Sequence, residues 1–322
     1  MTARGGSAMP ACSTVTLTMN PALDVSSEVA AVEPVAKLRC SAPRVDPGGG
    51  GINVARVMRR LGEDAACVFP AGGTTGQRLV ALLQGEGVHI VPVAIAEETR
   101  EDFTVLDRRS GQQYRFVMPG PSLAPAELAS CLEAMHLEDI CPAFVVASGS
   151  LPPGAPPDFY ADIARQAKAH GRKLVLDTSG VPLKAAFAAG VYLVKPNLRE
   201  LRELSGSALE NEADMLSAAR AIIAAGGAEI VALSLAENGA RLITRDAAWS
   251  ALAPAITPVS TVGAGDSFVG ALVHALATGA ALPEALRQAV AAGTAALLSH
   301  GTELCTAENV GRLLPQVTVR QI

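Results

Sequence analysis

The sequence predicts an α/β fold with a mainly parallel central sheet, helices on both of its faces, and a small discontinuous β-sheet that forms a lid. Short runs rich in β-branched residues alternate with helical stretches of about 10–15 residues, and the runs are almost continuously apolar, which is typical of parallel strands covered on both faces. Two other segments, about 25–46 and 99–118, alternate in residue character instead, and RSGQ within the second is typical of a hairpin turn. These two segments predict the lid, as a small antiparallel sheet.

Seven strands are expected in the main sheet. Each is a short run dominated by Val, Ile, Leu, Thr or Phe, such as TVTLTM near the start of the chain. They lie at 14–19, 66–71, 144–148, 173–178, 192–196, 230–235 and 240–244. Parallel sheets of this kind bind ligands beyond the carboxyl ends of their strands, so the functional residues are expected there.

Helices are expected between and after these strands. In the first of them, Ile52, Ala55 and Met58 recur every third residue and predict one buried face. The predicted helices lie at 52–61, 77–84, 125–137, 158–170, 198–204, 212–225, 267–278, 282–298 and 307–314. No repeat, low-complexity tract or linker interrupts the pattern, so we expect residues 1–322 to form a single domain that includes the lid.

Composition and charge exclude several classes of protein. The net charge is −5 and the isoelectric point about 5.6, with Lys and Arg scattered along the chain, so nucleic acid is not an expected partner. No apolar run reaches the ~18 residues of a membrane span, and the start of the chain lacks the apolar core of a secretory signal. The six cysteines and five histidines show no metal-ligand spacing. We therefore expect a cytoplasmic protein with reduced thiols.

The strongest local motif is TVGAGDSFVGALVHALATG at 261–279. A Gly-Ala-Gly loop enters a helix, so the free amides of Gly263, Ala264 and Gly265 are expected to point outward at the positive end of the helix dipole, where they would bind an anion. Asp266 could simply cap the helix. Next to a bound phosphate, the same carboxylate could accept a proton from an attacking hydroxyl, and the glycine loop favours that catalytic role.

A second motif is LVKPNLRELRELSG, in which Lys195, Asn197 and Glu200 follow a strand and open a helix. Asn197 and Glu200 are three residues apart, so their oxygens share one side of the first turn and could hold a hydrated magnesium ion with its phosphates. Alternatively, Asn197 caps the helix and Glu200 completes a capping box. The spacing alone does not choose between the two roles.

A third group combines Asp24 with the glycine run Gly48 to Gly51 and Asn53. Asp24 follows the first strand and the glycines follow the first lid segment, so both can line one crevice. Asp and Asn suit sugar hydroxyls, and glycines let the backbone approach a polar ligand. A flexible linker is the alternative, but this run leads directly into a helix with a buried stripe.

Four cations lie in the predicted lid segments: Lys37, Arg39, Arg100 and Arg115. Such residues are usually exposed charges. If the lid closes over the crevice, they would grip an anionic group of the substrate.

The motifs resemble those of the PfkB family of ribokinase-like carbohydrate kinases, over about residues 14–305. PGGGGINVARVMRRLG is similar to the first family signature and STVGAGDSFVGA to the second. The segments KLRCSAP, FPAGGTTGQRLVALL, GQQYRFVMPG, SGSLPPG, LVKPNLREL and GTELC sharpen the resemblance to the 6-phosphofructokinase branch of the isozyme 2 type.

The resemblance implies an ATP-dependent phosphorylation of a sugar phosphate, fructose 6-phosphate at its 1-hydroxyl, as in glycolysis. Asp266 would be the catalytic base, the amides of Gly263, Ala264 and Gly265 the anion hole, Asn197 and Glu200 would act on Mg²⁺, and Lys195 on ATP. Ser234 to Gly239 would lie along the nucleotide. The sugar would be held by Asp24, Gly48, Gly49, Asn53 and Ser150, and its 6-phosphate by Lys37, Arg39 and Arg100. The lid would also be the interface of a homodimer.

Some positions depart from the family pattern, and others leave the dependence on a monovalent cation open. Ala236 stands where a glycine is common in the nucleotide loop. Five residues fall where some relatives bind a monovalent cation such as K⁺: Ser260, Val262, Ala296, Ser299 and Gly301. Glu303 stands where the most similar relatives carry a basic residue, which leaves potassium dependence open.

Three functions compete on the sequence alone. Many 1-phosphofructokinases and tagatose-6-phosphate kinases carry a lysine at the place of Gly50, so Gly50 favours fructose 6-phosphate as the acceptor. Those two kinase activities are the alternatives. A third and more remote alternative is a catalytically inactive sugar or nucleotide sensor, which is disfavoured because Asp266 and its glycine loop are intact.

Overall fold

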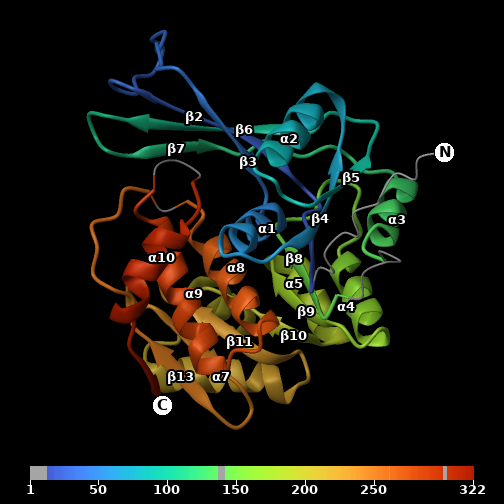
Figure 1. The fold of residues 1–322 in the computed structure, drawn as a ribbon, viewed down its shortest axis with the longest axis vertical. Helices are drawn as coiled ribbons and strands as arrows, with labels where there is room; N and C mark the ends of the chain where they lie inside the picture. Colours follow the sequence, from blue (N-terminus) through green and yellow to red (C-terminus); the bar gives the residue numbers. More distant parts are fainter. Residues whose placement is uncertain (1–12, 137–141, 261, 300–302) are drawn as a thin grey trace, which may run out of the picture.

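The computed structural model describes residues 13–136, 142–260, 262–299 and 303–322, and their central feature is one large sheet (Figure 1). Its strands are β1 (Thr14–Leu17), β4 (Ala65–Ala71), β5 (Ile90–Ala94), β8 (Phe144–Ser148), β9 (Lys173–Asp177), β10 (Val191–Val194), β11 (Ala228–Ser234), β12 (Ala240–Ile243), β13 (Ala248–Ala251) and β14 (Val319–Gln321). They are ordered β14-β13-β12-β11-β10-β9-β8-β1-β4-β5. Strands β5 to β11 in this order run parallel, and β12, β13 and β14 extend the sheet antiparallel.

Helices cover both faces of this sheet, as expected. One face packs against α1 (Gly50–Arg60), α2 (Gly73–Gly85), α8 (Ala264–Ala277), α9 (Leu282–Ala296) and α10 (Ala307–Leu313). The other packs against α3 (Pro125–Glu133), α4 (Phe159–Ala169), α5 (Gly180–Ala189), α6 (Leu198–Ser205) and α7 (Glu212–Ala224). Successive strand residues alternate between the two cores: Val146 points to the first and Val145 to the second, as side chains on a pleated strand must.

The seven strands and nine helices expected from the sequence are confirmed, with shifted ends. Helix α8 begins at Ala264 and not at 267, and α1 begins at Gly50 and not at 52. The expected helix 125–137 ends at Glu133, and residue 137 lies outside the described ranges. Strands β5, β13 and β14 and helix α5 were not predicted.

A second, small sheet contains the two segments expected to form a lid. It consists of β2 (Ala22–Val29), β3 (Arg44–Gly48), β6 (Arg100–Asp107) and β7 (Gln113–Phe116), in the order β3-β2-β6-β7. The outer pairs are antiparallel, as expected, whereas the central pair β2–β6 is parallel. In Figure 1 this small sheet lies above α1, α8 and α10.

The small sheet has two different faces. Asp24 on β2 lies opposite Asp46 on β3 and Asp102 on β6, so these carboxylates form a row across the sheet. Phe103 and Phe116 are paired on the other face and are partly exposed to solvent, by 39% and 52%. The polar face thus carries the candidate substrate residue Asp24, and the opposite face is apolar.

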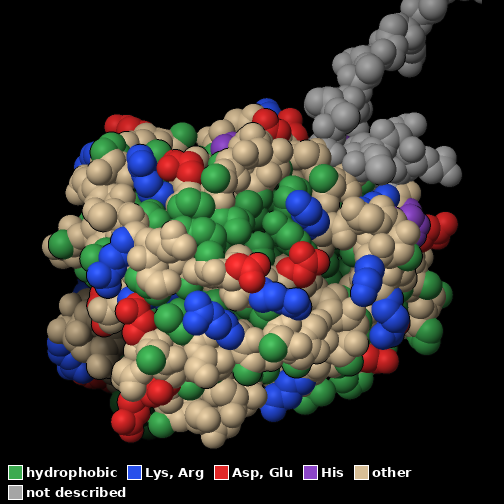
Figure 2. Space-filling model, turned by 90° about the horizontal axis from the view of Figure 1, so that it is seen from below, with side chains coloured by type: hydrophobic (Ala, Val, Ile, Leu, Met, Phe, Trp, Pro, Cys, Tyr) green, Lys and Arg blue, Asp and Glu red, His purple; other side chains and the backbone are tan. Residues whose placement is uncertain are grey.

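The surface carries both apolar and charged side chains (Figure 2). Among the described residues, none of the helices combines the length and apolar character that a membrane span needs. Figure 2 shows a face on which hydrophobic side chains are bordered by Lys and Arg mixed with Asp and Glu. The cysteines in the described ranges are free, with Cys40 exposed and Cys67, Cys131 and Cys305 buried.

Candidate active site

The N-terminus of α8 presents open amides. Gly263 is its N-cap, in the left-handed region with a φ of 78°, and no side chain caps the helix. The first amides of a helix have no partner within it, so within the described part of the chain those of Gly263, Ala264 and Gly265 are open to an anion. A Cβ at Gly265 would lie 3.8 Å from the Lys195 Nζ. The loop therefore combines backbone amides with a nearby ammonium group.

Asp266 lies in the first turn of α8 but does not cap it. Its Oδ2 accepts a hydrogen bond of 2.8 Å from the Asn53 Nδ2 on α1. Burial raises the pKa of Asp266 to about 6, against the lowering effect of the Asn53 hydrogen bond; Asp177 also raises it, while Lys195 and Arg56 lower it. A carboxylate with this pKa is deprotonated at neutral pH and basic enough to accept a proton.

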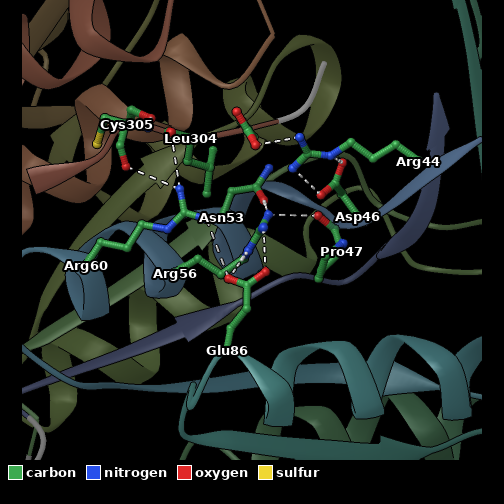
Figure 3. A network of polar contacts seen from close by, with 11 residues as sticks. Arg44, Asp46, Pro47, Asn53, Arg56, Arg60, Glu86, Leu304 and Cys305 are labelled. Atoms are coloured by element: carbon green, nitrogen blue, oxygen red, sulfur yellow. Dashed lines mark hydrogen bonds and ion pairs between the residues drawn. The ribbon is translucent and has the colours of Figure 1, made fainter. Parts of the chain in front are cut away.

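Asn53 belongs to a polar network that continues into the protein (Figure 3). Its Oδ1 accepts a 3.1 Å hydrogen bond from Arg56, whose guanidinium also binds Glu86 and the Pro47 carbonyl. Nearby, Arg44 on β3 pairs with both Asp46 and Glu303. The Asp266 carboxylate is thus connected to α1, α2 and β3.

Lys195 follows β10 and is almost completely buried, at 7% exposure. Its Nζ forms an ion pair with the Asp177 Oδ1 at 3.2 Å, at the end of β9. Burial alone would lower the pKa of Lys195, but Asp177, Glu200 and Asp266 together raise it. The ammonium group therefore stays charged and lies against the amide loop.

Asn197 and Glu200 form the capping box of α6. The Asn197 Oδ1 accepts from the Glu200 amide, and the Glu200 Oε2 accepts from the Asn197 amide, both at 2.9 Å. Asn197 also bridges to Ser234 at the end of β11. Gly239, five residues after the end of β11, adopts a positive φ of 74°. These predicted nucleotide and magnesium residues therefore gather at the carboxyl ends of β10 and β11.

The glycine run is required by close packing. A Cβ at Gly48 would lie 2.6 Å from the Asp24 carboxyl atoms, and one at Gly50 would lie 2.1 Å from the Ser148 Oγ. At Gly51 it would lie 2.4 Å from the Leu17 carbonyl oxygen, and Gly49 has a φ of 122°. The run therefore lets α1 start directly against β1, β8 and the small sheet, and it is not a flexible linker.

Asp24 has an unusual environment. Burial and the nearby Asp102 raise the pKa of Asp24 to about 7, although Arg115 and Arg100 lower it. Its carboxyl lies against the Gly48 backbone. The small sheet thus brings a carboxyl that keeps its proton up to about pH 7 toward the glycine strip that begins α1.

The other predicted sugar-phosphate residues are less closely grouped. Arg100 donates to the carbonyls of Asn20, Pro21 and Met118 and lies 3.4 Å from Asp102. Ser150 accepts a 3.2 Å hydrogen bond from Asn20. Lys37 and Arg39 are exposed in the connection between β2 and β3. The structure therefore places Arg100 and Ser150 around Asn20, and leaves Lys37 and Arg39 on the surface.

The predicted monovalent-cation residues lie at the end of α9. The amides of Val259 and Ser260 donate to the Leu297 carbonyl, and the Ser299 amide donates to the Ala296 carbonyl. The Val262 amide donates to the Ser260 Oγ. Gly301 lies outside the described residues. Four of the five predicted positions are thus close to one another in the fold.

Sequence reasoning missed several residues of this site: Asn20, Arg56, Glu86 and Asp177. Asp177 could have been found, because it is the penultimate residue of the apolar strand predicted at 173–178. Asn20 lies in the NPALD segment beside Asp24, and its Oδ1 is buried without a hydrogen-bond partner among the described residues. Arg56 and Glu86 carry no local signal, since their pairing depends on how α1 and α2 pack.

Comparisons with known proteins give a consistent result. A model of the pfkB family carbohydrate kinases matches residues 10–309. An ATP-dependent 6-phosphofructokinase isozyme 2 from Mycobacterium tuberculosis (strain H37Rv) is 48% identical over 298 residues, 92% of this chain and 88% of that protein. The isozyme 2 of Escherichia coli K12 is 42% identical, over 92% of this chain and 96% of its own.

Solved structures agree with these relatives. Crystal structures of phosphofructokinase-2 from E. coli, one in complex with potassium and one with substrates and products, are each similar with a TM-score of 0.90 and 41% sequence identity. They cover 95% and 94% of this chain, and 99% and 98% of the E. coli chain. The structure of a tetrameric inhibited form of that protein has a TM-score of 0.89 with 40% identity, over 95% of this chain and 99% of its own.

Proposed function

This chain belongs to the pfkB family of carbohydrate kinases, and we propose that it transfers the γ-phosphoryl group of ATP to the 1-hydroxyl of fructose 6-phosphate. The observation that carries this proposal is the Asp266 carboxylate, held by Asn53 beside the open amides of α8. Relatives at 48% and 42% identity are 6-phosphofructokinases, which supports the acceptor.

In this reaction Asp266 accepts the proton of the attacking hydroxyl. Its pKa of about 6 leaves it ionised at neutral pH, and the Asn53 hydrogen bond occupies Oδ2, so Oδ1 is the oxygen we assign to the sugar. A general base matched in this way to the working pH typically contributes ~10²–10⁴-fold to the rate.

The charge that develops on the transferred phosphoryl group is received by the α8 amides and by Lys195. Helix N-termini favour negative charge, and the Lys195 ammonium lies beside Gly265. Fixed donors of this kind need no reorganisation during the reaction, which is why they lower the barrier.

Mg²⁺ fits the oxygen groups at the start of α6. The Asn197 Oδ1 and the Glu200 Oε2 are engaged in the capping box, and each residue keeps further acceptor capacity. Oxygen donors suit a hydrated Mg²⁺ held with ATP phosphates. Bound there, the metal would neutralise phosphate charge, while Ser234 and Gly239 would lie along the nucleotide. A K⁺ ion at Ser260, Val262, Ala296 and Ser299 is a further proposal, since the related E. coli structure holds potassium.

The small sheet is proposed to be the lid of the substrate site and part of one kinase domain. Asp24, Gly48, Gly49, Asn53 and Ser150 would hold the sugar, and Lys37, Arg39 and Arg100 its 6-phosphate. Closure would bring Lys37 and Arg39 from the surface toward the phosphate, and Arg100 would exchange a backbone carbonyl for a phosphate oxygen.

The apolar face of the lid is proposed to form a homodimer interface. Phe103, Tyr114 and Phe116 are partly exposed there, and aromatic residues are enriched in interface cores. We also place the reaction in the cytoplasm, where free thiols such as Cys40 stay reduced.

A coupled assay of ADP release tests the proposed function. The enzyme is assayed with MgATP and fructose 6-phosphate, fructose 1-phosphate, tagatose 6-phosphate and the free sugars. We expect the highest kcat/KM with fructose 6-phosphate. If the kcat/KM for fructose 6-phosphate is more than ~10-fold below that for another sugar, a difference of about 1.4 kcal/mol in transition-state stabilisation, fructose 6-phosphate is not the preferred acceptor. If ligands bind but no sugar supports ADP release, the protein is not a kinase.

A further inference from the structure

Arg56 is a buried charge in the middle of α1. Only 1% of its surface is exposed, yet its neighbour on the helix, Arg59, pairs with Asp64 at the surface. Arginine is seldom this buried unless it is fully paired, because moving a charge out of water costs several kcal/mol. The contacts of Arg56 must therefore offset a large penalty.

The guanidinium contacts three different parts of the fold. Its Nε and Nη2 bind the two Glu86 carboxylate oxygens at 2.8 and 2.7 Å, at the C-terminal end of α2. Its Nη1 donates to the Pro47 carbonyl on β3 and to the Asn53 Oδ1, both at 3.1 Å. One planar group thus fixes α1, α2 and the end of β3 relative to one another (Figure 3).

The contact with Asn53 also determines which way the amide faces. An amide group has an acceptor end and a donor end. Asn53 lies between a guanidinium that only donates and the Asp266 carboxylate that only accepts. Turning the amide over would place two donors together and two acceptors together. Arg56 therefore allows one orientation, in which the Nδ2 donates to Asp266.

We propose that Arg56 is a positioning residue for phosphoryl transfer: through Asn53 it holds the Asp266 carboxylate in its reactive orientation, and through Pro47 it couples that orientation to strand β3 of the lid. This proposal rests on the proposed role of Asp266 as the base. The competing role is structural only, in which the Arg56–Glu86 pair fastens α1 to α2 and leaves the reaction untouched.

Arg56→Lys tests the proposal, because it keeps the charge and removes the planar fork. We expect kcat to fall by ~10-fold or more, the scale of loss from a small misplacement of a reacting group, with the KM for ATP unchanged. Arg59→Gln is the matched control on the same helix, and its kcat should equal that of the wild type. Equal kcat for Arg56→Lys and the wild type would overturn the proposal.

The pH profile of kcat distinguishes a loss of positioning in Arg56→Lys from a loss of stability. The Asn53 hydrogen bond lowers the pKa of Asp266, so loss of its orientation should move the acid limb of kcat to higher pH. The charged groups that face Asp266 besides Arg56 are Asp177 and Lys195, and both remain in the variant. A variant that is merely less stable would keep the acid limb of the wild type, and that result would overturn the proposal.

A double-mutant cycle tests whether Arg56 acts through Asn53. If it does, Arg56→Lys should reduce kcat by less than ~3-fold in an Asn53→Ala background, since linked residues are not additive. An undiminished loss in that background would contradict the proposal. If Arg56→Lys does not fold, Glu86→Gln replaces one of the two carboxylate oxygens that accept from the guanidinium by an NH2 donor. The same decrease in kcat and shift of the acid limb are then expected, and an unchanged profile would overturn the proposal.

Asp266→Asn distinguishes this proposal from the one it rests on. If Asp266→Asn abolishes turnover while Arg56→Lys does not reduce it, the positioning role fails and the base survives. If Asp266→Asn turns over normally, the proposed base itself fails.

Discussion

At the scale of single residues, the site holds carboxyl groups in places that raise their pKa. Asp24 is the clearest case, with a pKa near 7 caused first by burial and then by Asp102. In the unfolded chain an aspartate titrates near 3.9. Between these two values the folded state binds the extra proton, so the free energy of unfolding falls as pH rises through this window. Above pH 7 the cost is fully present, and below about pH 4 it is absent.

Asp24→Asn should therefore stabilise the protein at pH 8 and have little effect at pH 4. The difference between a pKa of about 7 in the folded chain and about 3.9 in the unfolded chain corresponds to at most about 4 kcal/mol, and partial exposure of Asp24 makes the gain smaller. Urea unfolding of both proteins at the two pH values measures it. Exposed Asp246→Asn is the control, and no gain for Asp24→Asn at pH 8 would show that Asp24 is not an unfavourable buried charge.

The sequence predicted some of these residues better than others. Asp266, Asn53 and Lys195 could be singled out because each lies next to a glycine loop or a strand end, and the structure brings them together. Whether they perform the assigned roles stays a prediction. Arg56 and Glu86 could not be singled out, because they are 30 residues apart and meet only when α1 packs on α2.

At the scale of elements, local signals determined which segments could be predicted. Strand β13 (AWSA) has no β-branched residue, and β5 (IVPVA) contains a proline that is unusual inside a sheet. Helix α5 begins GVP and has a weak apolar stripe. Helix α8 begins earlier than expected because Gly263 adopts the left-handed conformation at its N-cap.

The turn 235–239 contains a residue that glycine would suit better. Ala236 has a positive φ of 50°, a conformation that costs a non-glycine residue ~1–2 kcal/mol. Ala236→Gly should remove this strain and raise the free energy of unfolding, by up to about 1 kcal/mol once the greater freedom of glycine in the unfolded chain is counted. The control is Ala280→Gly, outside regular structure with no positive φ. Destabilisation by Ala236→Gly as large as that of the control would contradict this account.

At the scale of the whole molecule, the candidate site draws on both sheets. Asp266 and Asn53 come from helices on the main sheet, Lys195 and Asp177 from the ends of its strands, and Asp24 from the small sheet. Arg44 on β3 also pairs with Glu303, ahead of α10. Because the sequence shows which segments alternate but not which strands pair, it predicted the lid and not the parallel β2–β6 pairing.

The apolar face of the lid predicts a dimer. We expect wild-type protein to have twice the 32.9 kDa chain mass in sedimentation equilibrium, and Phe116→Glu to shift it toward the monomer, because a charge would be buried at the centre of the interface. Val181→Glu, at an exposed apolar residue on α5, should leave the dimer intact. A monomeric wild type would exclude the dimer, and a Phe116→Glu variant that stays dimeric would place the interface on another surface.

Asp266 is the proposed base of an ATP-dependent transfer to fructose 6-phosphate. The most direct test is the turnover of Asp266→Asn with saturating MgATP and fructose 6-phosphate, together with its ATP affinity. We expect that ATP still binds and that kcat falls by at least ~100-fold, the range for loss of a general base. Near-normal turnover by Asp266→Asn would contradict it.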